Sequence, residues 1–203
     1  MTASSAPRHR AEGNRMKQIR LIKTTLAIAL FVVAGAAQAD VEKFMSNCDG
    51  KLCPYFQLAL TPPDGWIVEQ EATNKNRVQI LVPKGKNFGN APALIYVQVF
   101  FHRDKQQSLA NFAEVSNDRW RANVKGAKIS ALPEVKRANG KPGFLRFAFE
   151  NPTKAQQPYE MGAFGTDGDK DGNEFILDVV MTGLNKAAVD AVEKDYVAFL
   201  KAH

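Results

Sequence analysis

The sequence predicts an α+β domain, in which helices pack on the faces of an antiparallel β-sheet. Short strand-like segments in the second half are joined by tight turns, and Asn139-Gly140 is a dipeptide typical of hairpins. Residues 93–101 are apolar on both faces, as expected for a central strand that is covered on both sides. Two stretches with apolar residues at helical spacing predict the helices that provide this cover.

The first half of the domain is predicted to be mainly strands. Residues 55–60 alternate until two prolines and a glycine impose a turn, and residues 66–69 then resume as a short strand. Residues 77–82 alternate as a half-buried strand, and a loop rich in glycine and asparagine leads into the central strand.

The second half adds two helices and two hairpins. Ser108 is a good N-cap for a helix that runs to about residue 124, whose Trp120 is expected to pack in the core. Two hairpins follow, one joining 134–138 to 144–150 and the other joining 158–165 to 174–182 around an acidic loop. Asn185 then caps a closing helix with a sustained apolar stripe.

Residues 16–39 have the pattern of a secretory signal peptide. A basic segment precedes an apolar run over residues 26–37, and Ala37-Gln38-Ala39 is a small-x-small cleavage site with Asp40 after it. The run is shorter than the roughly 20 residues of a spanning helix, so no transmembrane anchor is expected in the mature chain. Residues 1–15 are either an extension of the basic segment or the product of a start codon placed too early. We therefore expect a leader over 1–39, a disulfide-bearing segment over 40–54 and one domain over 55–203, in a periplasmic or secreted protein.

The charge of the mature chain argues against a nucleic-acid partner. The full chain has 27 basic and 21 acidic residues, but residues 1–39 hold six of the basic and one of the acidic ones. Cleavage therefore leaves 21 basic and 20 acidic residues, a net charge of +1. Because binding to phosphates depends on a surplus of Lys and Arg, nucleic-acid binding is not expected.

Cys48 and Cys53 are the only cysteines, and the predicted export places them in an oxidising compartment. Asp49-Gly50 between them favours a tight turn, across which the two sulfurs meet. A thioredoxin-type redox pair has two intervening residues and this pair has four, so a structural disulfide is preferred.

Asp167-Gly168-Asp169-Lys170-Asp171-Gly172 matches the first six positions of a calcium-binding loop. Asp178 falls at the twelfth position, where a longer glutamate normally supplies two oxygens. Strands rather than helices flank the loop, and the alternative is an ordinary hairpin turn built from Asp and Gly. The sequence thus offers Asp167, Asp169, Asp171 and Asp178 as candidate Ca²⁺ ligands, and it indicates no other cofactor.

Motifs of enzymes are not found in the sequence. There is no Gly-x-Ser-x-Gly, no dinucleotide or phosphate loop of glycines and no His-Glu-x-x-His. His102 is predicted to be a surface residue at the end of a strand, and its alternative is a general base in an unrecognised hydrolase. The sequence thus names no catalytic residue.

The order of elements resembles that of the PsbP-like proteins, a group that includes an extrinsic subunit of photosystem II and secreted bacterial relatives. The resemblance rests on 60–66 (Leu-Thr-Pro-Pro-Asp-Gly-Trp), on the helix start at 108–113 and on the passage from Phe175 into the Asn185 helix. It implies α/β/α layers over most of residues 55–201, and a binding or assembly role rather than catalysis.

The expected function is therefore that of an exported, soluble envelope protein that acts as a non-enzymatic binding or accessory module. Its expected partner is an envelope protein or a small ligand. The alternatives are a calcium-stabilised binding domain that uses 167–172 and an unrecognised hydrolase.

Overall fold

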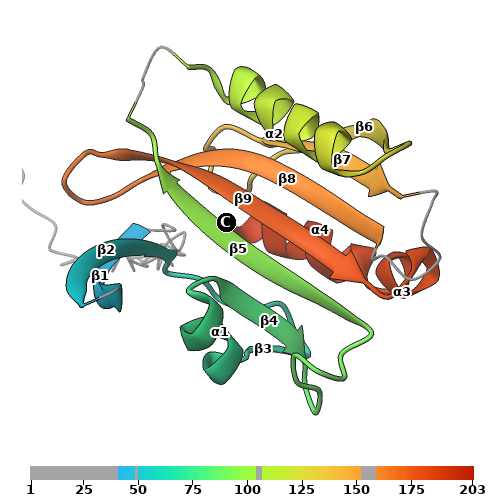
Figure 1. The fold of residues 1–203 in the computed structure, drawn as a ribbon, viewed down its shortest axis with the longest axis horizontal. Coiled ribbons are helices and arrows are strands. Elements are labelled where there is room, and N and C mark those ends of the chain that lie inside the picture. Colours follow the sequence, from blue (N-terminus) through green and yellow to red (C-terminus); the bar gives the residue numbers. More distant parts are fainter. Residues whose placement is uncertain (1–40, 49, 104–106, 152–158) are drawn as a thin grey trace, which may run out of the picture. The chain divides into compact units, whose positions relative to one another are not determined.

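The computed structural model describes residues 41–48, 50–103, 107–151 and 159–203, and all of them belong to one compact unit. The predicted leader and its cleavage site lie outside the described residues. The strands form a seven-stranded sheet and a separate two-stranded sheet, and every pair of neighbours is antiparallel. Four helices accompany them within these described residues (Figure 1). The predicted α+β class with an antiparallel sheet is thus confirmed.

The seven-stranded sheet has the order β3-β4-β5-β9-β8-β7-β6, with β5, β9 and β8 at its centre. Its strands, in chain order, are β3 (Trp66–Val68), β4 (Gln79–Pro83), β5 (Ala93–Phe101), β6 (Lys128–Val135), β7 (Phe144–Glu150), β8 (Tyr159–Gly168) and β9 (Glu174–Gly183). The central position of β5 confirms what its two apolar faces predicted.

The C-terminal helices cover one face of this sheet. They are α3 (Lys186–Asp190) and α4 (Glu193–Ala202), and α4 passes behind β9 and β5 in Figure 1. Alternate residues of β9 point towards α4, whose Tyr196 is fully buried and donates its hydroxyl hydrogen to the Val179 carbonyl oxygen at 2.8 Å. The largest buried cluster lies here and includes Leu177, Val179, Met181, Tyr196, Phe199 and Leu200.

The opposite face carries α2 (Leu109–Asn123) and α1 (Gln70–Asn76). Phe112 of α2 packs against Phe164 of β8, and Trp120 lies 5.3 Å from the ring of Phe149, as centroids. Ser108 accepts a hydrogen bond from the Asn111 N–H, which confirms the predicted N-cap. The two helical layers enclose the sheet, and this arrangement explains why β9 is buried along most of its length.

The two-stranded sheet is a hairpin of β1 (Val41–Cys48) and β2 (Lys51–Leu58). Its base packs on the main sheet through Phe56, which lies 4.8 Å from Phe175 and 6.2 Å from Phe101, as ring centroids. The boundary that we expected at residue 54 falls inside β2, so residues 40–54 are not a separate segment.

Four other parts of the fold differ from the sequence-based expectations. Strand β1 and helix α1 were not predicted; α1 is short and depends on a cap, in which the Glu69 carboxylate accepts from the Ala72 N–H at 2.7 Å. Strand β6 begins six residues before the predicted 134–138, at Lys128. The closing helix is interrupted at residues 191–192 and becomes α3 and α4.

Candidate functional site

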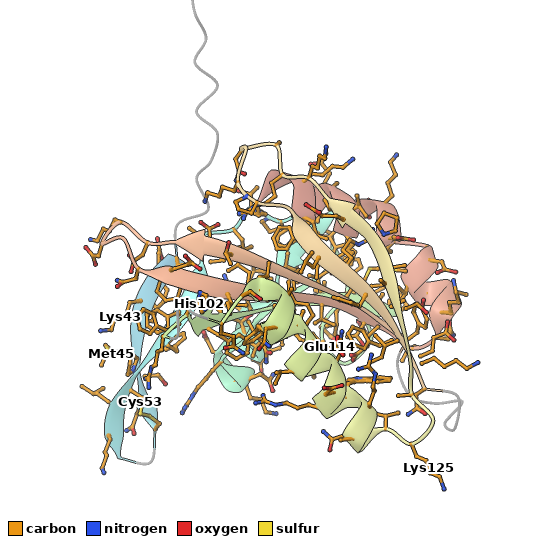
Figure 2. The ribbon with its side chains drawn as sticks, turned by 90° about the horizontal axis from the view of Figure 1, so that it is seen from above. Lys43, Met45, Cys53, His102, Glu114 and Lys125 are labelled. Atoms are coloured by element: carbon orange, nitrogen blue, oxygen red, sulfur yellow. A yellow bond between two sulfur atoms is a disulfide. The ribbon has the colours of Figure 1, made fainter. Side chains whose placement is uncertain are left out.

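The hairpin of β1 and β2 carries the exposed apolar side chains that best mark a contact surface. Met45 is 54% exposed and Leu52 is 73% exposed. In the hairpin register Met45 and Leu52 lie on the same face as Val41, Phe56 and Leu58, because positions two apart share a face. At the base this face is buried against the body, and towards the tip it is open to solvent (Figure 2).

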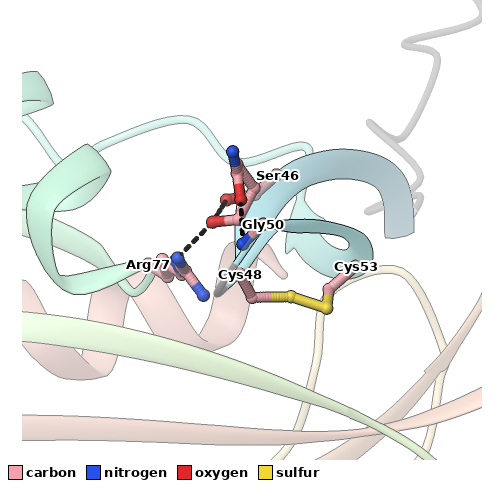
Figure 3. Close-up of a disulfide and its surroundings, with 6 residues drawn as sticks. Ser46, Cys48, Gly50, Cys53 and Arg77 are labelled. Atoms are coloured by element: carbon pink, nitrogen blue, oxygen red, sulfur yellow. Dashed lines mark hydrogen bonds between the residues drawn. A yellow bond between two sulfur atoms is a disulfide. The ribbon is translucent and has the colours of Figure 1, made fainter.

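The tip of the hairpin is cross-linked. Cys48 and Cys53 form a disulfide with their Cα atoms 5.9 Å apart, which confirms the predicted pairing (Figure 3). Arg77, at the end of α1, donates from Nη2 to the Asn47 carbonyl oxygen at 2.6 Å. The disulfide and the guanidinium together fix the tip, so that its exposed side chains are held on a rigid support.

The base of the hairpin is held by a buried amide. The Gln79 side chain in β4 accepts from the Leu58 N–H and donates to the Leu58 carbonyl oxygen, both at 2.8 Å. One side chain therefore satisfies both main-chain groups of Leu58, as a neighbouring strand would. Phe44 and Tyr55 stack across the hairpin with their ring centroids 5.4 Å apart, which adds cross-strand packing.

A cavity of about 540 Å³ separates β1 from the loop between β8 and β9. It is lined by residues from both elements, namely Val41, Glu42, Lys43, Phe44, Asp169, Lys170 and Asp171. The predicted calcium loop thus forms one wall of a cavity, and the edge of β1 forms the other.

The structure does not bring the four candidate calcium ligands together. Asp167 pairs with Phe175 across the β8–β9 ladder, so these two side chains lie on one face of the sheet. Asp178 is three positions beyond Phe175, and this odd separation directs it to the opposite face. Among the residues that the structure describes, no group of three or more His, Cys, Asp or Glu side chains is placed to hold a metal ion.

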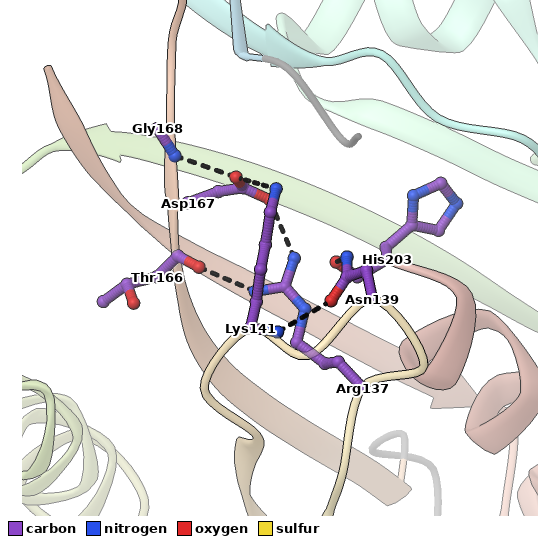
Figure 4. Close-up of polar contacts among 7 residues, drawn as sticks. All are labelled: Arg137, Asn139, Lys141, Thr166, Asp167, Gly168 and His203. Atoms are coloured by element: carbon purple, nitrogen blue, oxygen red, sulfur yellow. Dashed lines mark hydrogen bonds and ion pairs between the residues drawn. The ribbon is translucent and has the colours of Figure 1, made fainter. Parts of the chain in front are cut away.

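Each of these aspartates has a different environment. Asp167 is buried in ion pairs with Arg137, at 2.8 Å between Nη2 and Oδ2, and with Lys141 (Figure 4). Asp169 accepts hydrogen bonds from the Asp171 and Asn173 N–H groups and from the Asn173 side chain, which together lower its pKa. Asp169 therefore organises a turn, which is the alternative that the sequence offered.

Asp178 lies on the α2 side of the sheet, where burial and the negative charge of Glu160 raise its pKa to about 7. Its Oδ1 is shielded from solvent and has no hydrogen-bond partner. Burial also raises the pKa of Glu160. These carboxylates are four positions apart in the register, because Glu160 pairs with Thr182. At about 3.3 Å per residue their Cα atoms are too distant for one metal ion to hold both.

His102 is buried, at 8% exposed, rather than lying on the surface as we expected. Its Nδ1 is 2.6 Å from the Glu174 carboxylate and its Nε2 is 2.8 Å from the Gln107 carbonyl oxygen. Both ring nitrogens therefore tie β5 to β9 and to the residues before α2. This arrangement gives His102 a structural role at the end of β5.

Comparisons with known proteins leave the family undetermined. No protein-family model matches the chain, and no curated protein matches it significantly. The resemblance to PsbP-like proteins therefore stays a prediction. No helix in the described part of the chain has the length and apolar character needed to cross a membrane.

Proposed function

We propose that this protein is an exported, non-enzymatic binding module, and that the open face of the β1–β2 hairpin is its contact surface. The observation that carries this proposal is the exposure of Met45 and Leu52 on a hairpin whose base and tip are both fixed. Exposed apolar side chains on a rigid support are a common basis of protein recognition, because little conformational entropy is lost on binding.

The environments of the polar residues support binding rather than catalysis. His102, Asp167 and Asp169 are three of the five residues that the sequence offered for chemistry or metal binding. Each of them is engaged in hydrogen bonds or ion pairs that hold the fold together. The signal-peptide pattern and the disulfide support export, because disulfides persist in oxidising compartments.

Leu52→Ser tests this proposal, with Leu184→Ser as the matched control. Leu184 is also an exposed leucine, at 69%, and it lies outside the hairpin, beyond the end of β9. In capture from an envelope extract, we expect the wild type and Leu184→Ser to recover the same partner and Leu52→Ser to lose it. Equal recovery by both variants, or no reproducible partner, would count against the hairpin as the contact surface.

A further inference from the structure

The four strand edges of this fold differ in how they are protected against pairing with another chain. An unprotected edge offers a row of main-chain hydrogen-bonding groups, so proteins shorten edge strands or interrupt them with proline and bulges. In the seven-stranded sheet, β3 has only three residues, and β6 contains Pro133 within a register shift between Leu132 and Val135. In the hairpin, β2 contains Pro54, whereas β1 contains no proline.

The hydrogen bonds of Leu58 show which N–H and C=O groups of the hairpin point away from the partner strand. The Leu58 N–H and C=O groups bond to Gln79 rather than to β1, so they point outward from the hairpin ladder. Outward-pointing pairs recur at every second position of an antiparallel ladder. Pro54 is four residues from Leu58 and is therefore outward-pointing, so β2 lacks an N–H donor at this point of its edge.

The residues of β1 that pair with outward-pointing residues of β2 also point outward. They are Val41, Lys43 and Met45, which pair with Leu58, Phe56 and Pro54. The register is continuous through all eight pairs of the hairpin, without a bulge. At the next outward position, Asn47, the carbonyl oxygen is already taken by Arg77. Within the described part of the chain, no hydrogen bond reaches the outward groups of Lys43 or Met45.

A cavity lies next to the first half of β1. The cavity of about 540 Å³ between β1 and the β8–β9 loop is lined by the first four residues of β1 and by Asp169, Lys170 and Asp171. An incoming segment would bond to the β1 main chain on one side and meet the charged loop on the other.

We propose that the free edge of β1 at Lys43 and Met45 binds an extended segment of a partner polypeptide as an added antiparallel strand. This mode obtains affinity from main-chain hydrogen bonds and specificity from alternate side chains. Met45 and Lys43 share one face, so the segment has an apolar residue beside Met45 and an acidic residue beside Lys43, two positions apart. The proposal rests on the function proposed above and names the partner class for the same hairpin.

Charge disfavours a second copy of this chain as the occupant. A two-fold antiparallel register centred on Lys43 pairs Val41 with Met45 of the second copy and places Lys43 opposite its own symmetry mate. Like charges directly opposite each other in a sheet are destabilising. A partner with an acidic residue at that position replaces this repulsion with attraction.

The test uses the oxidised protein and a displayed library of random linear octapeptides. Selected peptides are synthesised, and their dissociation constants are measured for the wild type, Met45→Val and Met45→Pro. Proline removes the outward N–H of position 45 and leaves the bonds to β2 intact, as Pro54 does opposite it, whereas valine keeps the donor. Because Met45→Val keeps the main-chain donor and Met45→Pro removes it, we expect Met45→Pro to bind at least about tenfold more weakly than Met45→Val.

Two further measurements identify the added strand. In the complex, the amides of Lys43 and Met45 become protected from hydrogen exchange, and Lys43→Glu reverses the preference of the library from acidic to basic residues. Equal affinity for Met45→Pro and Met45→Val overturns the proposed strand addition. The proposal also fails if no peptide is enriched, or if the protein self-associates and Met45→Pro abolishes that self-association. If Leu52→Ser abolishes partner capture and Met45→Pro does not, the proposed function stands and only the strand addition fails.

Discussion

Asp167 was a candidate calcium ligand in the sequence, and in the structure it forms a buried ion pair instead. Its side chain is 1% exposed, and that of its partner Arg137 is fully buried. Arg137 also donates to the Thr166 carbonyl oxygen and lies over the ring of Phe144. The carboxylate balances a charge that has no access to water, so its removal leaves an uncompensated cation in the protein interior.

Asp167→Asn is therefore expected to lower the free energy of unfolding by about 3–5 kcal/mol, the usual cost of breaking a buried pair. The measurement is urea unfolding followed by circular dichroism. Asp171→Asn is the control, because Asp171 is exposed in the same loop, and a change within about 0.5 kcal/mol is expected for it. Similar effects of the two substitutions would show that the ion pair is not what matters at position 167.

The β1–β2 hairpin has one feature that the sequence predicts and others that it does not. Its disulfide follows from the spacing of Cys48 and Cys53 and from the expected compartment. Strand β1 does not follow, because only Val41 is buried on the face that it shares with Lys43, Met45 and Asn47, and Lys43 and Asn47 interrupt the apolar alternation. The support from Gln79 had no signal in the sequence, since a glutamine within a strand indicates nothing about its partner.

Cys48→Ser combined with Cys53→Ser is expected to loosen the hairpin tip rather than unfold the protein. Closure of so short a loop stabilises by about 2 kcal/mol, and the Phe56 and Gln79 contacts at the base remain. Hydrogen exchange should accelerate at amides of β1 and β2 and stay unchanged in β9. Acceleration throughout the sheet would instead make the disulfide essential to the whole fold.

At the scale of the whole molecule, the sheet and its layers could be predicted because their signals are local. The Asn139-Gly140 turn, the two apolar faces of β5 and the Ser108 cap each depend on neighbouring residues. The environments of the candidate calcium ligands could not be predicted in the same way. An ion pair joins Arg137 to Asp167, and Asp167 and Asp178 lie on opposite faces of the sheet; both features depend on strand register, which the spacing in the sequence did not reveal.

Burial of Asp178 makes the stability of the molecule depend on pH. Its pKa is about 7 in the folded protein and near 3.8 when the chain is unfolded, so folding takes up a proton between these values. The stabilisation that this group contributes is complete below about pH 4 and is lost as the pH rises through about 7.

Asp178→Asn removes this titration. Relative to the wild type, the variant should gain stability between about pH 4 and pH 8, by at most about 4 kcal/mol at about 1.4 kcal/mol for each unit of pKa. Urea unfolding at several pH values measures the difference, and Asp171→Asn should run parallel to the wild type. A constant offset for Asp178→Asn would mean that this carboxyl group does not titrate differently in the two states.

Pro54 has a consequence for how copies of this protein coexist at high concentration. A fibre of stacked hairpins grows only when both edges of each hairpin can pair with another molecule. In this protein the edge of β2 lacks an N–H donor at Pro54, and at the end of the strand Gln79 already bonds to the main chain of Leu58. A molecule that captures a strand through β1 therefore ends the chain of contacts, so we expect complexes of fixed, small stoichiometry rather than filaments.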